Sequence, residues 1–303
     1  MQLHRRDLAW DSFCLARKRK LKEASINGHC APQEKLHHHH LDDLLRALAK
    51  GHEQTGLCFA LFKADIDAAY RRVPIMRDHW WASAIVFLFM GVPWVAVHKA
   101  MPFGALAAVH AWERIGALLT KIGRTVLKIA LFRYVDDFFG CERPALVDHS
   151  LGCLVRLLRL LLGCSAVADA KVGCGSKLLI LGVDVVVRKK GCTCRPAAEK
   201  IVKWLKAIEK ALAVNCLSPG DASKLAGRLN WSCQFMFRRV GRAMLRPLHM
   251  QKSAAKPYAL SSELRHTLCW WQQILGAGVA EKQVWKQPSE SIVHLFCDAA
   301  GKA

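Results

Sequence analysis

Two adjacent carboxylates interrupt an apolar stretch and constrain this chain more than any other feature of its sequence. Residues 132–140 read FRYVDDFFG, and apolar residues precede and follow the acidic pair. This pattern predicts two buried strands joined by a turn at Asp136 and Asp137. Because adjacent anions at the tip of an apolar hairpin repel each other, they stay ionised at neutral pH when a cation neutralises them. The hairpin therefore predicts a bound cation, and a solvated Asp-Asp turn is the alternative.

A third carboxylate follows another apolar run. Residues 57–62 read LCFALF and predict a short buried strand that leads directly to Asp65. A carboxylate at the end of a buried strand requires a metal ion or a cationic partner. Hard oxygen ligands select Mg²⁺ or Mn²⁺ over zinc. If Asp65 lies beside Asp136 and Asp137, the three acids form a site for two divalent ions, as in-line phosphoryl transfer requires.

The charge balance indicates a polyanionic partner. The 303 residues carry 45 Lys and Arg against 24 Asp and Glu, a formal net charge of +21, and 52% of the side chains are hydrophobic, which predicts a globular protein. Nucleic acid is the expected partner, and an anionic membrane surface is the alternative. The long uncharged run from Trp80 to Val97 is interrupted by a Gly-Val-Pro turn, so it predicts two buried strands rather than a membrane-spanning helix.

Cysteine usage and the first residues favour an intracellular protein, cytoplasmic or nuclear. The amino-terminal residues have no apolar segment behind their charges, so they predict no signal peptide. The 13 cysteines show no disulfide-framework spacing and are expected to be small buried hydrophobes. Half of a zinc site at Cys174, Cys192 and Cys194 is the alternative. The run His37–His40 predicts a solvated segment leading into a helix, with metal binding as its alternative.

The order of predicted elements indicates an α+β fold. Strands and helices are mixed without the regular alternation of a doubly wound sheet. The expected elements are a helix from Leu41 that ends at Gly51, a helix from about Ala105 whose apolar face includes Leu118, a helix over Leu151–Leu162, one strand over Leu178–Val187, and helices from Pro196, from Ser218 and over Leu260–Leu275.

A basic helix is predicted after Ser218, where a cap, a proline and an acid stand in the order of a helix start. This helix is expected to run towards Pro247. Arginines recur along it at every fourth residue, which would place them on one face. The predicted nucleic-acid-binding residues are Arg228, Arg238, Arg242 and Arg246.

Several motifs together resemble those of the reverse transcriptases of retroelements, most closely the tyrosine-recombinase class of retrotransposons. Residues 65–74 read DIDAAYRRVP, residues 102–104 read PFG, residues 134–137 read YVDD, and residues 225–229 read LAGRL. The resemblance extends over about residues 50 to 303. It implies a right-hand polymerase palm, an antiparallel sheet packed on helices with partial fingers, followed by a helical thumb or connection.

The resemblance also implies an activity, RNA-directed DNA polymerisation by a two-metal mechanism, and a role for individual residues. Asp65, Asp136 and Asp137 would be catalytic, and together with the backbone carbonyl of Ile66 they would hold two Mg²⁺ ions, or Mn²⁺. The substrates would be an RNA or DNA template, a DNA primer and deoxynucleoside triphosphates. The implied nucleotide-binding residues are Tyr70, which excludes a 2′-hydroxyl, Phe103 and Gly104, which position template and nucleotide, and Lys171, near the departing pyrophosphate.

Four segments are expected from the same resemblance. They are a basic amino-terminal segment with partial fingers over residues 1–50, palm and fingers over 51–190, a helical thumb or connection over 191–290, and the start of a ribonuclease H-like domain over 291–303. That last segment supplies one acid of the ribonuclease H set, Asp298, so we expect no ribonuclease H activity. The reduced fingers motif leaves a competing hypothesis, a remnant that binds nucleic acid without polymerising.

Overall fold

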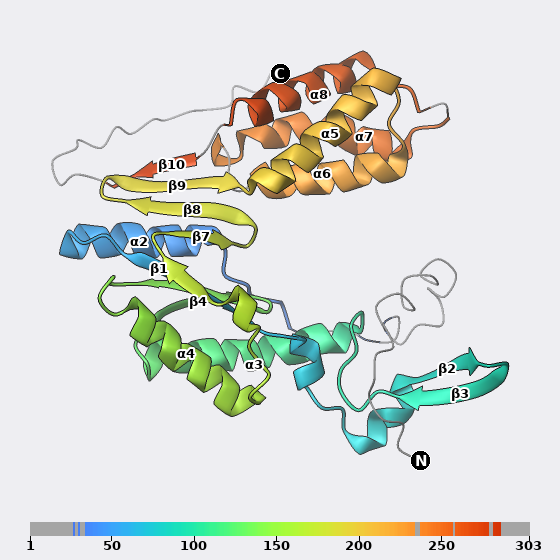
Figure 1. The fold of residues 1–303 in the computed structure, drawn as a ribbon. Helices are drawn as coiled ribbons and strands as arrows, with labels where there is room; N and C mark the ends of the chain where they lie inside the picture. Colours follow the sequence, from blue (N-terminus) through green and yellow to red (C-terminus); the bar gives the residue numbers. More distant parts are fainter. Residues whose placement is uncertain are drawn as a thin grey trace, which may run out of the picture.

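A computed structural model describes residues 27, 30, 34–233, 237–256, 258–278 and 281–285, and within these ranges the side chains of residues 237–240 and 281–284 are left out. The described residues form two four-stranded sheets, one two-stranded sheet and a set of helices (Figure 1). All strand pairs in these sheets are antiparallel. The predicted α+β class is confirmed.

The first sheet has a helix layer on each face. Its strand order is β4-β5-β1-β6. The strands are β1 (Ala60–Asp65), β4 (Ala130–Tyr134), β5 (Asp137–Glu142) and β6 (Gly173–Gly175). Because successive side chains alternate between the faces of a strand, Phe62 and Phe138 pack with helices α3 (Leu106–Thr125) and α4 (Val147–Leu162), whereas Leu61 and Phe139 pack with helix α2 (Leu41–Thr55). The strands that carry the acids are therefore buried on both faces.

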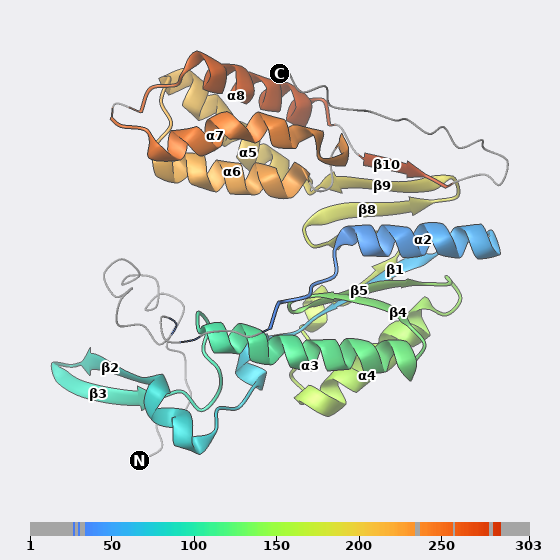
Figure 2. The same cartoon turned by 180° about the vertical axis from the view of Figure 1, so that it is seen from behind.

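The second sheet lies on the other side of α2 (Figure 2). Its order is β10-β9-β8-β7, with strands β7 (Lys177–Ile180), β8 (Val183–Arg188), β9 (Gly191–Pro196) and β10 (Glu281–Val284). The expected single strand over Leu178–Val187 is wrong. Leu181 and Gly182 have φ angles of 49° and 74°, so the chain reverses there in a two-residue turn and makes a hairpin.

The carboxyl-terminal part is helical and has its own core. Its elements are α5 (Ala198–Val214), α6 (Pro219–Cys233), the 3₁₀ helix η5 (Phe237–Leu245), α7 (Arg246–Met250), the 3₁₀ helix η6 (Gln251–Ser253) and α8 (Ser262–Gly276). The helix expected from Pro196 begins at Ala198, and residues 191–196 before it form β9. Residues 291–303 lie outside the described part.

The expected helix from Ser218 to Pro247 is also wrong. It ends at Cys233, and residues 237–245 form the 3₁₀ helix η5. A 3₁₀ helix has three residues per turn, so arginines spaced by four do not share one face. Arg242 and Arg246 lie in different helices, η5 and α7, rather than on one continuous helix.

Other differences concern helix ends and burial. Helix α2 ends at Gly56, whose φ of 67° is left-handed, and Gly51 lies inside the helix, where a Cβ would come 2.7 Å from the Phe59 ring. Leu118 on α3 is 59% exposed, because the buried face of that helix runs through Ala108, Trp112 and Leu119.

The run from Trp80 to Val97 forms a projecting hairpin. After the 3₁₀ helix η3 (Arg77–Ser83), strands β2 (Ala84–Phe89) and β3 (Val92–Val97) pair as expected, but they stand away from the rest of the fold (Figures 1 and 2). Leu88 is 73% exposed, so the expectation that these strands are buried is wrong. No helix among the described residues has both the length and the apolar character needed to cross a membrane.

Gly140 tests the tight packing of the first sheet. A Cβ at Gly140 would lie 2.2 Å from the Ala130 carbonyl oxygen and 2.4 Å from the Phe62 ring. We expect Gly140→Ala to lower the free energy of unfolding by about 2 to 3 kcal/mol. The control is Gly152→Ala on α4, where a Cβ meets no atom within 4 Å and a gain of about 0.5 to 1 kcal/mol is expected. Urea unfolding measures both variants, and equal stability of the two would contradict this packing.

Candidate active site

The pairing of β1 with β5 brings the three predicted acids together. Asp65 is the register partner of Asp137, and the Ile66 N–H donates to the Asp136 carbonyl over 3.1 Å. Register partners in an antiparallel pair have Cα atoms within about 5.5 Å of each other. Asp65, Asp136 and Asp137 therefore lie at one end of the first sheet, although they come from distant parts of the sequence.

The pKa values of two of these acids reflect their crowding. The pKa of Asp137 is raised to about 6, mainly by burial and also by the charges of Asp65 and Asp136. The pKa of Asp136 is raised mainly by burial and also by Asp65. The nearby Lys171 lowers both pKa values but does not offset these effects. The site thus holds an excess of negative charge, which favours a bound cation.

Lys171 is a cation that the fold itself supplies to the site. It ends the 3₁₀ helix η4 (Asp169–Lys171), and its ammonium forms an ion pair with the Asp65 carboxylate. The hydrogen bond to Asp65 raises the pKa of Lys171, as do the charges of the three acids. The Ala168 N–H donates to the Asp65 carbonyl over 3.0 Å and fixes the segment that carries Lys171 beside β1.

The donor atoms suit a hard divalent cation. Within the described residues, no three His, Cys, Asp or Glu side chains are arranged so that they could hold a metal ion, and the Asp65 carboxylate is paired with Lys171. The three acids offer carboxylate oxygens, and Ile66 is held beside them by its N–H bond to the Asp136 carbonyl. Mg²⁺ and Mn²⁺ prefer such oxygen donors. Metal binding at the acids would require Lys171 to release Asp65.

Two of the other predicted nucleotide-binding residues, Tyr70 and Phe103, lie together near Asp136. Tyr70, in the 3₁₀ helix η2 (Ala69–Arg72), contacts Phe103 edge to face with ring centroids 5.3 Å apart. Burial raises the pKa of the Tyr70 hydroxyl, and the charge of Asp136 adds to that shift. Gly104 has a φ of 91°, and its carbonyl accepts from the Asn27 side chain over 2.7 Å. Asn27 was not singled out by the sequence analysis, because no local pattern marks a residue that positions a distant turn.

A cavity of about 350 Å³ is lined both by Asp137 and by Trp231 of α6. Asp137, Tyr134 and Lys63 line it from the first sheet, and the turn of the β7–β8 hairpin lines it from the second. His40 and Trp231 complete the lining, and the sequence analysis assigned neither to the site. The one sequence signal for Trp231 is its position three residues after Arg228, which was predicted to bind nucleic acid.

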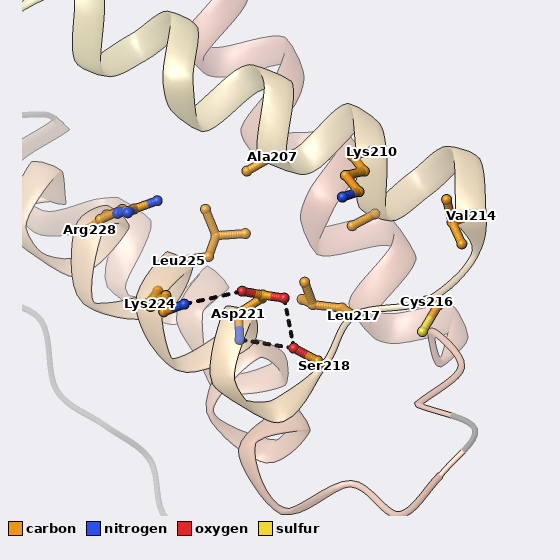
Figure 3. A pocket seen from close by; sticks show the side chains of 11 residues that line it. Ala207, Lys210, Val214, Cys216, Leu217, Ser218, Asp221, Lys224, Leu225 and Arg228 are labelled. Atoms are coloured by element: carbon orange, nitrogen blue, oxygen red, sulfur yellow. Dashed lines mark hydrogen bonds and ion pairs between the residues drawn. The ribbon is translucent and has the colours of Figure 1, made fainter. Parts of the chain in front are cut away.

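The basic surface lies along α5 and α6. Arg228 and Trp231 line a cavity of about 590 Å³ together with Lys200, Lys203 and Lys224. Arg228 and Lys224 also line a second cavity of about 360 Å³ between the two helices, which Figure 3 shows from close by. In that cavity Lys224 is 3.6 Å from Asp221, which accepts a hydrogen bond from the Ser218 hydroxyl. Arg242 and Arg246 are exposed, and the side chain of Arg238 lies outside the described part.

The histidine run and the cysteines have structural positions. His38 and His39 are half-buried rather than solvated, and the His39 N–H donates over 3.0 Å to the Arg133 carbonyl of the edge strand β4. Cys192 and Cys194 are buried in the core between α2 and the second sheet. The Cys174 thiol donates to Asp148 over 3.0 Å. The expectation that these cysteines are small core residues fits Cys192 and Cys194.

The raised pKa of Asp137 predicts a pH dependence of stability. The pKa of this carboxyl is about 6 in the folded chain and about 4 in the unfolded chain. Between these two pH values the folded chain therefore binds more protons than the unfolded chain. The free energy of unfolding thus falls as the pH rises from about 4 to about 6. In metal-free buffer, Asp137→Asn should remove that fall and gain about 1 to 2 kcal/mol relative to the native chain, less than the full shift because solvent screens the partly exposed side chain.

Urea unfolding across the window measures this difference. The control is Glu53→Gln, which removes one carboxylate from an exposed position on α2. A difference between Asp137→Asn and the native chain that does not change with pH would contradict the crowding of the three acids.

Comparison with solved structures establishes what this fold is similar to. The structure of the foamy viral protease-reverse transcriptase in complex with an RNA/DNA hybrid matches with a TM-score of 0.56 and 18% identity, over 84% of this chain and 31% of that chain. The structure of the foamy viral protease-reverse transcriptase dRH in complex with double-stranded DNA matches with a TM-score of 0.55 and 17% identity, over 83% of this chain and 40% of that chain. No protein-family model and no curated protein matches. The chain spans less than half the length of these viral proteins and shares the fold of that part.

Proposed function

We propose that this chain is an RNA-directed DNA polymerase of a retroelement that extends a DNA primer by template-directed nucleotidyl transfer. The observation that carries the proposal is the pairing of Asp65 with Asp137 at the end of the first sheet, beside Asp136. The fold shared with viral reverse transcriptases supports it. The assignment to the tyrosine-recombinase class of retrotransposons rests on the sequence motifs alone and stays a prediction.

In this proposal the three acids hold the metal ions of a two-metal mechanism. Asp65, Asp136 and the Ile66 carbonyl would bind Mg²⁺, with Asp137 in support. Bound Mg²⁺ would lower the pKa of the primer 3′-hydroxyl and neutralise charge on the departing pyrophosphate. Lys171 would exchange its ion pair with Asp65 for one with the pyrophosphate oxygens, since an ammonium binds phosphate as a point charge.

Nucleic acid would bind along the basic helices that face the same cavity as Asp137. Arg228 and the lysines of α5 and α6 line adjoining cavities, and Trp231 is shared with the cavity at the acids. If these side chains neutralise about six phosphates, affinity for primer-template falls roughly a thousandfold between about 50 and 200 mM salt.

Loss of Asp136 tests the polymerase directly. We expect Asp136→Asn to reduce primer extension on an RNA template with Mg²⁺ by more than about a hundredfold, because a ligand of the reacting ions is lost. The control is Asp67→Asn, which removes a nearby carboxylate that is 65% exposed and pairs with Arg72.

Binding of primer-template is measured in parallel by fluorescence anisotropy. Equal extension by Asp136→Asn and the native chain would defeat the assignment. Salt-sensitive binding by the native chain, with no Mg²⁺-dependent extension, would support the competing hypothesis of a binding remnant.

Tyr70 is assigned to sugar selection. Its ring lies against Phe103 near Asp136, where it would meet a 2′-hydroxyl on the incoming nucleotide. We expect Tyr70→Ala to incorporate ribonucleotides about tenfold or more better relative to deoxynucleotides, as single-nucleotide incorporation kinetics would show. Unchanged selectivity would remove Tyr70 from this role.

A further inference from the structure

The turn that carries the two aspartates is held in a costly conformation. Val135 stands between Tyr134 and Asp136 and has a φ of 53°. The left-handed region is open to glycine, but a β-branched side chain is rarely found there, because its Cβ crowds the backbone. Such a conformation persists when surrounding contacts enforce it. The contacts that enforce this conformation of Val135 should therefore determine where the Asp136 and Asp137 side chains point.

Two side chains hold the Val135 carbonyl. The Trp112 indole N–H donates to it over 2.8 Å, and the Arg133 guanidinium donates to it over 2.9 Å. A carbonyl with two donors fixes the orientation of the peptide plane between Val135 and Asp136, and hence the start of the acidic pair. We call these two donors, with the Glu113 that anchors Arg133, the turn clamp.

The turn clamp is built into the face of α3. Arg133 is 1% exposed, and its guanidinium lies 2.7 Å from the Glu113 carboxylate. Gly116 leaves the space that the guanidinium fills, since a Cβ there would lie 2.6 Å from the Arg133 Nε. His38 approaches the other Glu113 oxygen at 3.2 Å. The arginine is thus fixed from several sides, as a residue that orients another group must be.

Stability alone does not account for a buried ion pair at this position. Taking Arg133 and Glu113 out of water is costly, and apolar residues of similar volume often serve a core as well or better. Ion pairs of this kind are retained in some proteins because they select one conformation over another. Here the conformation that the Arg133–Glu113 ion pair could select is the left-handed backbone of Val135.

We propose that Arg133 is a positioning residue for nucleotidyl transfer: with Glu113 and Trp112, it holds Val135 in the left-handed conformation and so sets the direction of Asp136 and Asp137. This inference rests on the proposed polymerase function for its kinetic consequence. Its structural part, the control of the turn, does not depend on that function.

Arg133→Met tests the clamp because methionine fills part of the space without a donor. Small misplacements of catalytic groups cost about a hundredfold in rate, so we expect kcat for primer extension to fall about ten- to a hundredfold while the KM for the deoxynucleotide stays within about threefold. Glycine adopts positive φ without strain, so adding Val135→Gly should restore kcat to within about fivefold of the native value. A residue that acted only through core stability would show no such rescue.

Arg124→Met is the matched control. Arg124 lies on α3 and, like Arg133, donates to a backbone carbonyl of the β4 segment, but its acceptor is Leu131 and not Val135. We expect little change in kcat and no gain from Val135→Gly in that background. If Arg133→Met does not fold, Trp112→Phe removes the other donor while keeping an aromatic ring, and it should show a smaller loss with the same rescue.

Carboxyl ¹³C chemical shifts of Asp136 and Asp137 provide a readout that needs no activity. We expect them to move in Arg133→Met and to return towards native values when Val135→Gly is added. Native kcat in Arg133→Met, or a folded variant whose loss Val135→Gly does not rescue, would overturn the proposal. If the native chain extends no primer, the polymerase assignment fails, and unchanged shifts in Arg133→Met would separately overturn the clamp.

Discussion

The antiparallel pairing of β1 with β5 is the constraint on which the rest of the structure depends. It places Asp65 opposite Asp137, and it does so between two helix layers that bury both faces of the strands. Like charges in such a place repel, and the raised pKa values of Asp136 and Asp137 record that cost. The apolar packing of Phe62, Leu61 and their neighbours must supply the free energy that keeps the acids together. Such crowding of carboxylates favours the binding of a cation.

The remaining parts of the fold surround this site. Helix α2 lies between the two sheets, and the β7–β8 turn reaches the cavity that Asp137 lines (Figure 1). Trp231 of the helical part also lines that cavity. The Lys200 ammonium lies over the Trp231 ring, 4.1 Å from the ring centroid. Nucleic acids bind well to surfaces where aromatic side chains, which stack on bases, lie beside basic side chains, which pair with the phosphate backbone. The cavity that Asp137 lines and the cavity along α5 and α6 share Leu181 and Trp231 in their linings.

The sequence predicted the elements that local pattern determines and missed those that depend on distant partners. The apolar runs before Asp65 and around Asp136 became β1, β4 and β5 because burial on both faces requires continuous apolar strands. Residues 191–196 contain little apolar side chain, so strand β9 becomes visible only through its pairing with β8. The break after Cys233 carries no proline or glycine signal, and the arginine spacing suggested a longer helix. Likewise, no sequence pattern predicts the left-handed backbone of Val135 or the ion pair of Lys171 with Asp65.

The central claim is that Asp65, Asp136 and Asp137 form one metal site for nucleotidyl transfer. Titration with Mn²⁺ followed by electron paramagnetic resonance, with primer-template and a non-hydrolysable deoxynucleotide bound, tests it most directly. The account predicts two bound ions in the native chain and in Asp67→Asn, and loss of an ion or about a hundredfold weaker binding in Asp65→Asn. The same number of ions and the same affinity in Asp65→Asn as in the native chain would contradict it.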